Sequence, residues 1–226
     1  MSKNISLNEI PSPEEIRIFR YKILGWFEKH GRKYPWRDSY DPFKILIAEM
    51  MLRRTKADQV KPVYEQFFSE FSDVEALANA EDQTIEKILY PLGLKWRTPA
   101  FKLLARELKE KYHYRIPDKR EELKKLPGVG SYVAGAVLSI GYGKKEWMVD
   151  SNIVRVFRRY FGVKTSKEGR RDRQVIEMAK VYVFCRNPRN ANLAILDFTA
   201  LTCIPRKPRC KICPLQKKCK YVSSIP

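Results

Sequence analysis

Four cysteines lie within the last 24 residues of the chain, at a spacing that suits a metal centre. They are Cys203, Cys210, Cys213 and Cys219, separated by six, two and five residues. Two cysteines with two residues between them are a common chelate for zinc or for an iron–sulfur cluster. The long first gap differs from the paired Cys-x-x-Cys of a zinc ribbon, so the spacing favours a cubane iron–sulfur cluster over zinc.

The fifth cysteine, Cys185, stands apart, and we expect it to be an ordinary buried apolar side chain. An odd cysteine count does not suit a disulfide framework. The polar, proline-punctuated stretch from Met1 to Glu15 lacks the pattern of a secretory signal peptide. The clustered thiols therefore predict a metal site in a protein that we expect to be intracellular.

Basic side chains surround the four cysteines, and no acidic residue occurs from Cys203 to the end of the chain. The basic residues of this segment are Arg206, Lys207, Arg209, Lys211, Lys217, Lys218 and Lys220. The whole chain has 45 Lys and Arg against 26 Asp and Glu, a formal net charge of +19. This surplus predicts a polyanionic partner, with nucleic acid first and an anionic membrane surface second. A metal cluster would hold the basic segment in place, whereas a solvated tail is the alternative.

Three isolated carboxylates occur in apolar surroundings. Glu49 is the single acid of the apolar stretch Ile45–Leu52, so it is either salt-bridged in the core or held at a reactive site. Asp150 precedes a predicted helix at 152–161 and, taken alone, is an N-cap residue. Asp197 lies in a predicted apolar helix at 193–201, and we expect it to pair with an arginine.

A tight glycine turn joins two predicted helices in the middle of the chain. The turn is Leu126-Pro-Gly-Val-Gly130, between a short helix at 119–125 and an apolar helix at 131–142. Glycine lets the backbone adopt positive φ and leaves no Cβ in the way of a ligand. The amides of the turn and of the second helix's first turn then suit a phosphate oxygen. The pattern predicts a helix-hairpin-helix that binds nucleic acid, with a plain helical hairpin as the alternative.

Apolar residues recur at helical spacing through most of the chain, and strand patterns are nearly absent, so we predict an all-α protein. The further predicted helices are 13–30, 43–54, 57–71, 74–80, 82–90 and 96–111. In the last of these, Leu103, Leu104 and Leu108 are expected to face the core. No apolar run approaches the ~18 residues of a membrane span, and 44% hydrophobic residues exclude a disordered tail protein.

The glycine turn, Asp150 about 20 residues beyond it and the cysteine spacing together resemble the helix-hairpin-helix DNA glycosylase superfamily. The resemblance is to the iron–sulfur branch, which contains endonuclease III and adenine-mismatch glycosylase, and it runs from about Leu24 to Lys220. It implies a two-lobed all-α fold with a DNA cleft, a 4Fe–4S cluster on the four cysteines, and excision of a flipped base. The implied lobes are a six-helix barrel at 31–144, which carries the hairpin at 119–142, and a cluster domain of 1–30 plus 145–226, whose cluster loop is 203–219.

The resemblance assigns chemical roles to three residues. Asp150 matches the catalytic aspartate, whose carboxylate would stabilise an oxocarbenium-like sugar and orient or deprotonate the attacking water. Tyr132 stands where endonuclease III has a Schiff-base lysine. Because a phenol cannot form an imine, we expect little or no lyase activity at the abasic site. Glu49 matches the acid that protonates the departing base in adenine-mismatch glycosylase.

We expect DNA contacts from the hairpin, from two loops and from the basic segment. The residues are Gly128, Val129, Gly130, Ser131, Arg53, Arg54, Leu94, Arg206, Lys207 and Arg209. Arg54 would enter the gap left by the flipped base or contact the orphan guanine. Leu94 matches the wedge residue of the family on the opposite side.

Three features together resemble the archaeal mismatch thymine glycosylases, which remove T or U opposite G. They are Leu52-Arg53-Arg54-Thr55, where adenine-mismatch glycosylase has Leu-Gln-Gln-Thr, the tyrosine at 132, and the short segment after Cys219. We therefore predict a monofunctional glycosylase for T·G and U·G mispairs. Two alternatives stay open: an adenine glycosylase acting on A opposite 8-oxoguanine, and a non-catalytic DNA-binding module. We expect a monomer that acts on mismatched double-stranded DNA in a prokaryotic, archaeal cell and does not bind a membrane.

Overall fold

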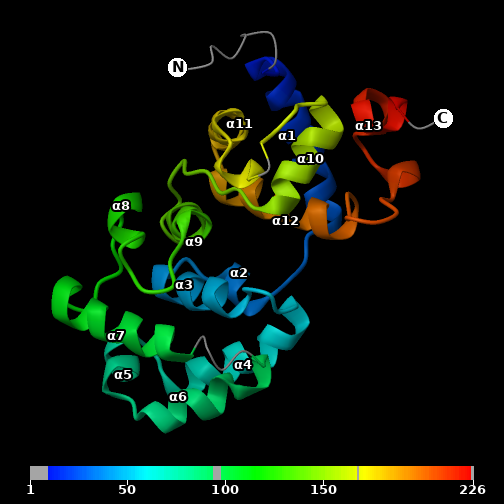
Figure 1. The fold of residues 1–226 in the computed structure, drawn as a ribbon. Coiled ribbons are helices and arrows are strands. Elements are labelled where there is room, and N and C mark those ends of the chain that lie inside the picture. Colours follow the sequence, from blue (N-terminus) through cyan, green and yellow to red (C-terminus); the bar gives the residue numbers. More distant parts are fainter. Residues whose placement is uncertain (1–9, 94–97, 167, 225–226) are drawn as a thin grey trace. The chain divides into compact units, whose positions relative to one another are not determined.

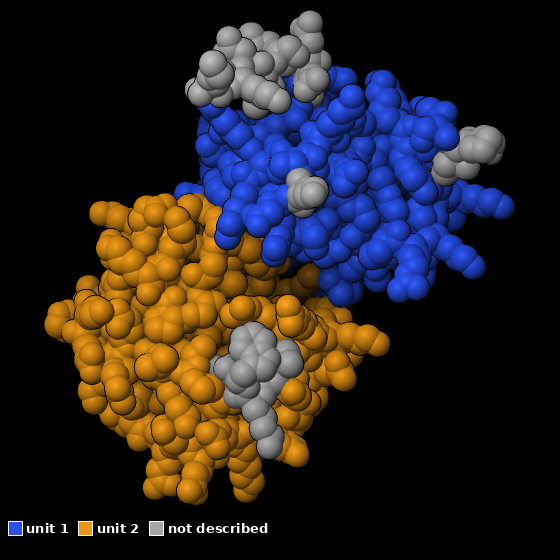
Figure 2. All heavy atoms as spheres, in the orientation of Figure 1, with its two compact units in different colours: residues 1–32, 144–226 blue, residues 33–143 orange. Residues whose placement is uncertain are grey.

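The computed structural model describes residues 10–93, 98–166 and 168–224, and the regular structure of these residues is helical without a strand. This confirms the all-α prediction. The chain divides into two compact units (Figure 1, Figure 2): unit 1 comprises Met1–Arg32 and Lys144–Pro226, and unit 2 comprises Lys33–Gly143. The sequence places the corresponding limits at 31 and 144. In the described part of the chain, no helix has the length and apolar character needed to cross a membrane.

Unit 1 is built from helices that come from both ends of the chain. They are α1 (Pro13–His30), α10 (Ser151–Phe161), η5 (Gly169–Arg171), α11 (Arg173–Val183), α12 (Pro188–Leu201), η6 (Cys210–Ile212), η7 (Gln216–Lys218) and α13 (Lys220–Ser223). Helix α1 packs against α11 and α12, and α10 packs against α12 and α13. The N-terminal helix and the cysteine-bearing segment therefore belong to one unit.

Helix α1 begins and ends where local chemistry predicts. The hydroxyl of Ser12 accepts a hydrogen bond from the Glu15 amide while the Glu15 carboxylate accepts one from the Ser12 amide, which is a capping box. Phe19 is fully buried and its ring contacts the rings of Phe157 and Tyr182. This aromatic cluster fixes α1 against α10 and α11, because deep apolar burial of this kind contributes about 2–3 kcal/mol per side chain.

Unit 2 contains the hairpin and the helices that support it. Its helices are α2 (Pro35–Asp38), α3 (Pro42–Met51), α4 (Ala57–Glu70), α5 (Val74–Asn79), α6 (Asp82–Leu89), η2 (Tyr90–Leu92), α7 (Thr98–Tyr112), α8 (Arg120–Leu123), α9 (Ser131–Ala136) and the π-helical η4 (Val137–Gly141). Helix α3 is buried on nearly every face and packs against α4, α9 and η4. Helix α7 packs against α5 and α6. Helix α3 thus joins the hairpin to the rest of the unit.

Two predictions for helices α3 and α7 of unit 2 are wrong. The helix predicted to reach residue 54 ends at Met51, because Arg54 adopts a left-handed backbone (φ 59°) that an α-helix excludes. Leu103 is 50% exposed, whereas Leu104 and Leu108 are fully buried as predicted. The buried stripe of α7 follows the helical period through 101, 104 and 108, and Leu103 falls outside it.

Candidate active site and cysteine centre

Asp150 is the N-cap residue of α10, and its carboxylate is half-buried and firmly held. Its Oδ1 accepts hydrogen bonds from the backbone amides of Asn152 and Ile153, at 2.9 and 2.8 Å. Its Oδ2 accepts one from the side-chain amide of Asn152 at 2.6 Å. The N-cap interpretation is therefore confirmed, and the same contacts fix the direction of both carboxylate oxygens.

A chain of hydrogen bonds runs from Asp150 to the backbone of the cysteine segment. The Asn152 oxygen that faces away from Asp150 accepts a 2.6 Å hydrogen bond from Nη1 of Arg155. Nε and Nη2 of Arg155 donate to the carbonyl of Cys203 at 3.0 and 2.9 Å, and Nη2 also donates to Thr199 at 3.0 Å. Sequence reasoning missed both Asn152 and Arg155. Their only local signal is a polar side chain two and five residues after the aspartate.

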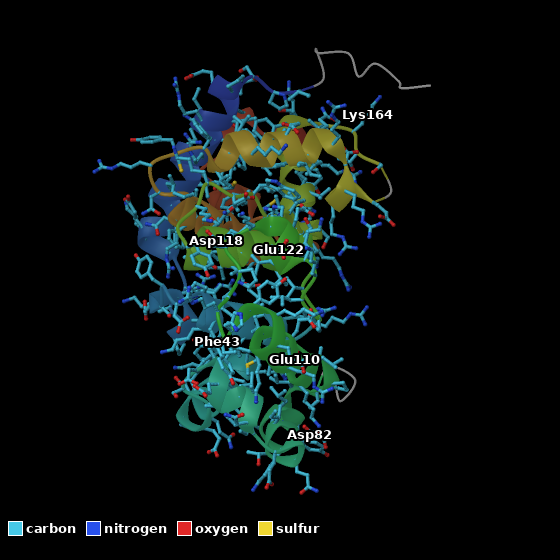
Figure 3. The ribbon with its side chains drawn as sticks, turned by 90° about the vertical axis from the view of Figure 1, so that its left-hand side faces the viewer. Phe43, Asp82, Glu110, Asp118, Glu122 and Lys164 are labelled. Carbon is cyan, nitrogen blue, oxygen red and sulfur yellow. The ribbon has the colours of Figure 1, made fainter. Side chains whose placement is uncertain are left out.

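The hairpin turn of unit 2 has the left-handed glycine that the sequence predicts at Gly128, where φ is +79°. The amide of Val129 donates to the Leu126 carbonyl at 3.1 Å, which closes the turn. Nη1 of Arg120 donates to the Ser131 carbonyl at 2.9 Å and so ties α8 to α9. Lys124 forms an exposed ion pair with Glu121 of α8. Lys125 forms one with Glu122, which is labelled in Figure 3.

Gly130 does not have the positive φ that we expected for both glycines. Its φ is −95°, a value open to any residue, and a Cβ built there would meet no atom within 4 Å. As N-cap of α9, Gly130 offers no side-chain oxygen to the first amides of the helix. Neither a Cβ nor a capping side chain of residue 130 therefore stands beside these amides.

The loop after α3 contacts the hairpin. Nη1 of Arg53 donates to the carbonyl of Gly128 at 3.3 Å, and Met50 lies beneath the same glycine. Arg53 and Arg54 are both exposed. The left-handed backbone at Arg54 is costly for a residue with a Cβ, by about 1–2 kcal/mol. The structure thus brings Arg53 to the hairpin and presents Arg54 from a strained turn, whereas Leu94 lies outside the described residues.

Glu49 and Tyr132 both belong to unit 2. Glu49 lies in the middle of α3 and only 7% of it is exposed, so its burial is confirmed. Tyr132 lies in the first turn of α9 and is half-buried. Their roles in catalysis stay predictions.

Asp197 is a structural ion pair, as predicted. It is fully buried in α12, and its carboxylate accepts hydrogen bonds from the backbone amide and from Nε of Arg32, each at 2.7 Å. A buried carboxylate needs such a partner. Arg32 is the last residue of the N-terminal segment of unit 1, so this pair fixes the segment to α12.

The four clustered cysteines lie in one region of unit 1, and their thiols influence one another. Cys203 and Cys213 are partly buried against the core that includes Cys219. The pKa of Cys213 is raised to about 11, chiefly by burial, and the charges of Cys203, Cys219 and Cys210 act in the same direction. Burial raises the pKa of Cys210 as well, with Cys219 and Cys203 next in effect.

The donor set fits a metal cluster in its chemistry. Among residues that the structure describes, no three His, Cys, Asp or Glu side chains are arranged as a ready ligand set. Four mutually interacting thiols are nevertheless the donors that iron–sulfur clusters use. Arg159 adds nearby positive charge, since its Nη1 donates to Sγ of Cys203 at 3.6 Å and to the Ile204 carbonyl at 2.7 Å. A guanidinium next to thiolates offsets their negative charge.

Two further sequence predictions concern residues of unit 1, namely the basic residues of the cysteine segment and Cys185. Arg206, Lys207 and Arg209 are all exposed, in the loop between Cys203 and Cys210. Cys185, in contrast, is only partly buried against the core, so the prediction of an ordinary buried side chain is wrong in degree. The neighbouring Phe184 is 70% exposed, so the connection between α11 and α12 is open to solvent at this point.

The comparisons with known proteins agree with these features. The family described as HhH-GPD superfamily base excision DNA repair protein matches residues 47–188. This range includes Glu49, the hairpin and Asp150. The chain belongs to this superfamily. The resemblance to the helix-hairpin-helix glycosylase superfamily is thereby confirmed.

Within the HhH-GPD superfamily, the chain is similar to thymine glycosylases over nearly its whole length. It is 38% identical to a thymine/uracil-DNA glycosylase of Methanothermobacter thermautotrophicus, over 91% of this chain and 93% of that protein. The solved structure of a thermostable thymine-DNA glycosylase superposes with a TM-score of 0.89 at 37% identity, covering 94% of this chain and 98% of that one. An adenine DNA glycosylase of Buchnera aphidicola is 32% identical, over 90% of this chain but 58% of that enzyme.

Proposed function

We propose that this protein is a monofunctional DNA glycosylase that removes thymine, and also uracil, opposite guanine. It would hydrolyse the N-glycosidic bond of a nucleotide flipped out of the duplex. The observation that carries the proposal is the fixed carboxylate of Asp150, held by two backbone amides and Asn152 within a base excision repair fold. The similarity to thymine/uracil-DNA glycosylases supports the choice of base.

Asp150 supplies the charge that the reaction needs. Loss of the base leaves a sugar with oxocarbenium character, and a carboxylate held in place stabilises that positive charge without having to reorient. Because the three N–H groups on Asp150 fix its position, little reorganisation is left to the reaction step. The same carboxylate can orient water or accept its proton. Glycoside hydrolases use carboxylates for a related purpose.

Contacts to the DNA would come from backbone and cationic groups. The amides at the start of α9 suit a phosphate oxygen, since the N-cap Gly130 has no side chain, whereas the Val129 amide already donates to the Leu126 carbonyl. Arg206, Lys207 and Arg209 suit other phosphates of the backbone. Arg54, exposed on its left-handed turn, suits the acceptors of the orphan guanine or the gap left by the flipped base. Choice of a mispaired thymine would follow in part from its easier extrusion, by a few kcal/mol.

The residue type at position 132 leads us to expect base release without strand cleavage. Strand cleavage by β-elimination starts from an imine between the abasic sugar and an amine. Tyr132, at the position discussed above, carries a phenol that forms no imine. We therefore expect little or no lyase activity. We also expect Tyr132 and Glu49 to lie beside the flipped base.

Cys203, Cys210, Cys213 and Cys219 would hold a 4Fe–4S cluster. Such a cluster would supply a structural cross-link that keeps the basic loop folded. The purified chain should then absorb in the violet-blue region and contain iron, and Cys213→Ser should lose both. Cys185→Ser, a cysteine outside the four, is the matched control and should keep both. A colourless wild-type protein that binds zinc would contradict the proposal.

Base excision from a panel of duplexes tests the proposed reaction. The panel contains T·G, U·G, A·8-oxoguanine and a matched duplex, and release is measured under single-turnover conditions. The wild type should release T and U opposite G. Asp150→Asn should reduce release by about a thousand-fold or more while mismatched DNA still binds.

Asp172→Asn is the matched control for Asp150→Asn. Asp172 is also an N-cap aspartate, and its Oδ1 accepts from the amides of Gln174 and Val175. Asparagine retains the capping ability at both positions. Equal activity of the two variants would contradict the proposed role of Asp150. A wild type that binds mismatched DNA without any base release would favour the non-catalytic DNA-binding module.

An adenine glycosylase is the second candidate. It is favoured by the 32% identity with the adenine enzyme and by the buried carboxylate of Glu49, the residue type that would protonate a departing adenine. The same duplex panel separates the two candidates, since release confined to the A·8-oxoguanine duplex would establish the second.

A further inference from the structure

A groove in unit 2 lies apart from the hairpin turn in sequence and is lined by four different segments. A cavity of about 540 Å³ opens between the start of α3, the start of α5, the loop 114–116 after α7, and Tyr142. Phe43 and Asp118, which lie in or near its wall, are labelled in Figure 3. None of the residues placed above in base excision lines this groove.

The inner wall of the groove is apolar and held in place by the fold. Phe43 and Val74 are buried beneath it, and Tyr142 remains 36% exposed. The hydroxyl of Tyr142 donates a hydrogen bond to the carbonyl of Ile116. The loop that carries Ile116 follows two left-handed residues, at 113 and 114. Because left-handed backbone costs conformational free energy in residues with a Cβ, the surrounding contacts must hold this loop in one conformation.

The rim of the groove is acidic. Asp41, Asp73 and Glu75 are exposed along it, and Arg115 is the basic residue of its lining. Asp41 and Asp73 are N-caps of α3 and α5. Asp41 accepts the amide of Phe43, and Asp73 accepts the amide of Ala76 and the hydroxyl of Ser72. An ionised carboxylate has about four acceptor positions, so both retain capacity for a further donor. Burial, with Asp118 and Asp41, raises the pKa of Tyr142, in line with a negative surrounding.

The groove adjoins the one long acidic tract of a basic protein. From Pro62 to Glu86 the sequence has no Lys or Arg and seven acidic residues. All seven acidic side chains are exposed, and they lie on α4, α5, α6 and the connections between these helices. Lys102 pairs with Asp82 and Glu86 at one end of the tract, and the other five acids leave a local negative surface on a chain with a net charge of +19. Such a surface repels DNA phosphates and attracts cations.

We propose that this acidic groove binds a Lys- and Arg-rich segment of another protein. The aliphatic stem of a lysine or arginine would pack on Phe43 and Tyr142 while its charged end meets Asp41, Asp73 or Glu75. Blocks of basic residues in proteins are often disordered interaction tails. The groove would give the repair protein a contact with such a neighbour while its basic surfaces stay on DNA. This inference goes beyond base excision and does not depend on which base is removed.

A fluorescein-labelled peptide of alternating arginine and glycine is the probe, titrated with the full chain at physiological salt. We expect saturable binding by fluorescence anisotropy, although the chain as a whole repels the peptide. The variant Asp41→Asn/Asp73→Asn/Glu75→Gln should bind at least about ten-fold more weakly, equal to ~1.4 kcal/mol. Asparagine keeps both helix caps, so this variant should remain folded, as circular dichroism can verify.

Glu65→Gln/Glu70→Gln/Glu81→Gln is the matched control, since it removes the same number of charges from the acidic tract outside the groove. It should keep the peptide affinity within about two-fold. Base release from the T·G duplex should be equal in the wild type and both variants, which separates this proposal from the proposed function.

Four results would overturn the proposal. The first is no saturable binding to the wild type. The second is an equal loss in both triple variants, which would indicate diffuse attraction by the acidic tract. The third is equal binding of a peptide of alternating glutamate and glycine. The fourth is displacement of the arginine peptide by millimolar Mg²⁺ alone, which would indicate a different ligand.

Discussion

Asp150 and Asp172 of unit 1 are the same residue type in the same capping position, but the groups around their carboxylates differ. Asp150 and Asp172 each cap a helix by accepting two backbone amides at Oδ1. Oδ2 of Asp172 accepts from the amide of Ser166, which anchors a loop. Oδ2 of Asp150 instead accepts from the side chain of Asn152, which Arg155 holds from the other side. The orientation of the proposed catalytic carboxylate therefore depends on two further side chains, Asn152 and Arg155.

Removal of the Asn152 side chain should slow base release while DNA stays bound. In Asn152→Ala, Oδ2 of Asp150 loses its 2.6 Å donor and the carboxylate gains freedom to turn. We expect the single-turnover rate to fall about ten- to a hundred-fold, because small misplacements of a reacting group are costly. Asn190→Ala, at an exposed asparagine of the same unit, should leave the rate unchanged. An unaltered rate in Asn152→Ala would show that the backbone amides suffice.

At the scale of elements, the hairpin uses its two glycines for different reasons. Gly128 needs a left-handed backbone, and a Cβ there would come within 3.1 Å of Met50. Gly130 has an ordinary extended backbone and open space around it. As the N-cap of α9 it provides no side-chain oxygen to the first amides of that helix. The first glycine thus serves the fold, and the second is available to serve a ligand.

Alanine at each glycine should separate the two reasons. Gly128→Ala should lower the free energy of unfolding by about 1 kcal/mol or more, because alanine is strained at positive φ. Gly130→Ala should change it by less than about 0.5 kcal/mol, since the loss of a favourable N-cap is offset by a stiffer unfolded chain. Gly130→Ala should nevertheless weaken DNA binding about ten-fold, because its Cβ obstructs a phosphate. Denaturant unfolding and a binding titration check both. Normal DNA affinity in Gly130→Ala would remove the amides from the proposed interface.

At the scale of the whole molecule, positive charge is concentrated in one unit. Unit 1 has 26 Lys and Arg against 10 Asp and Glu, a surplus of 16, whereas unit 2 has 19 against 16, a surplus of 3. The acidic tract at 62–86 accounts for much of the difference. Nonspecific attraction to DNA should therefore come chiefly from unit 1, and its strength should fall steeply with salt.

The salt dependence of DNA binding tests this division. Each cation on a phosphate contributes about 0.9 to the slope of log affinity against log salt. Arg206→Ala/Lys207→Ala/Arg209→Ala should lower the magnitude of that slope by about two to three, across all duplex sequences. Lys61→Ala/Lys87→Ala, at exposed lysines that flank the acidic tract, should leave the slope unchanged. The division would be wrong if the two variants changed the slope equally per charge removed.

The sequence by itself determined what depends on local chemistry. The limits of α1, the cap at Asp150 and the turn at Gly128 follow from residues within a few positions of one another, as does the spacing of the cysteines. Even the arginine partner of Asp197 was predictable as a type, because a buried charge requires one.

Only the tertiary structure decided which distant residues meet. It selected Arg32 as the partner of Asp197, joined Arg155 to the Cys203 carbonyl, and brought Arg53 to Gly128. It also corrected Leu103 and Gly130, whose residue types gave no hint of their surroundings, and gathered the four segments of the acidic groove. The reason is that hydrogen bonds and packing between distant segments depend on how helices are placed in three dimensions, and a local pattern of residues does not contain that placement.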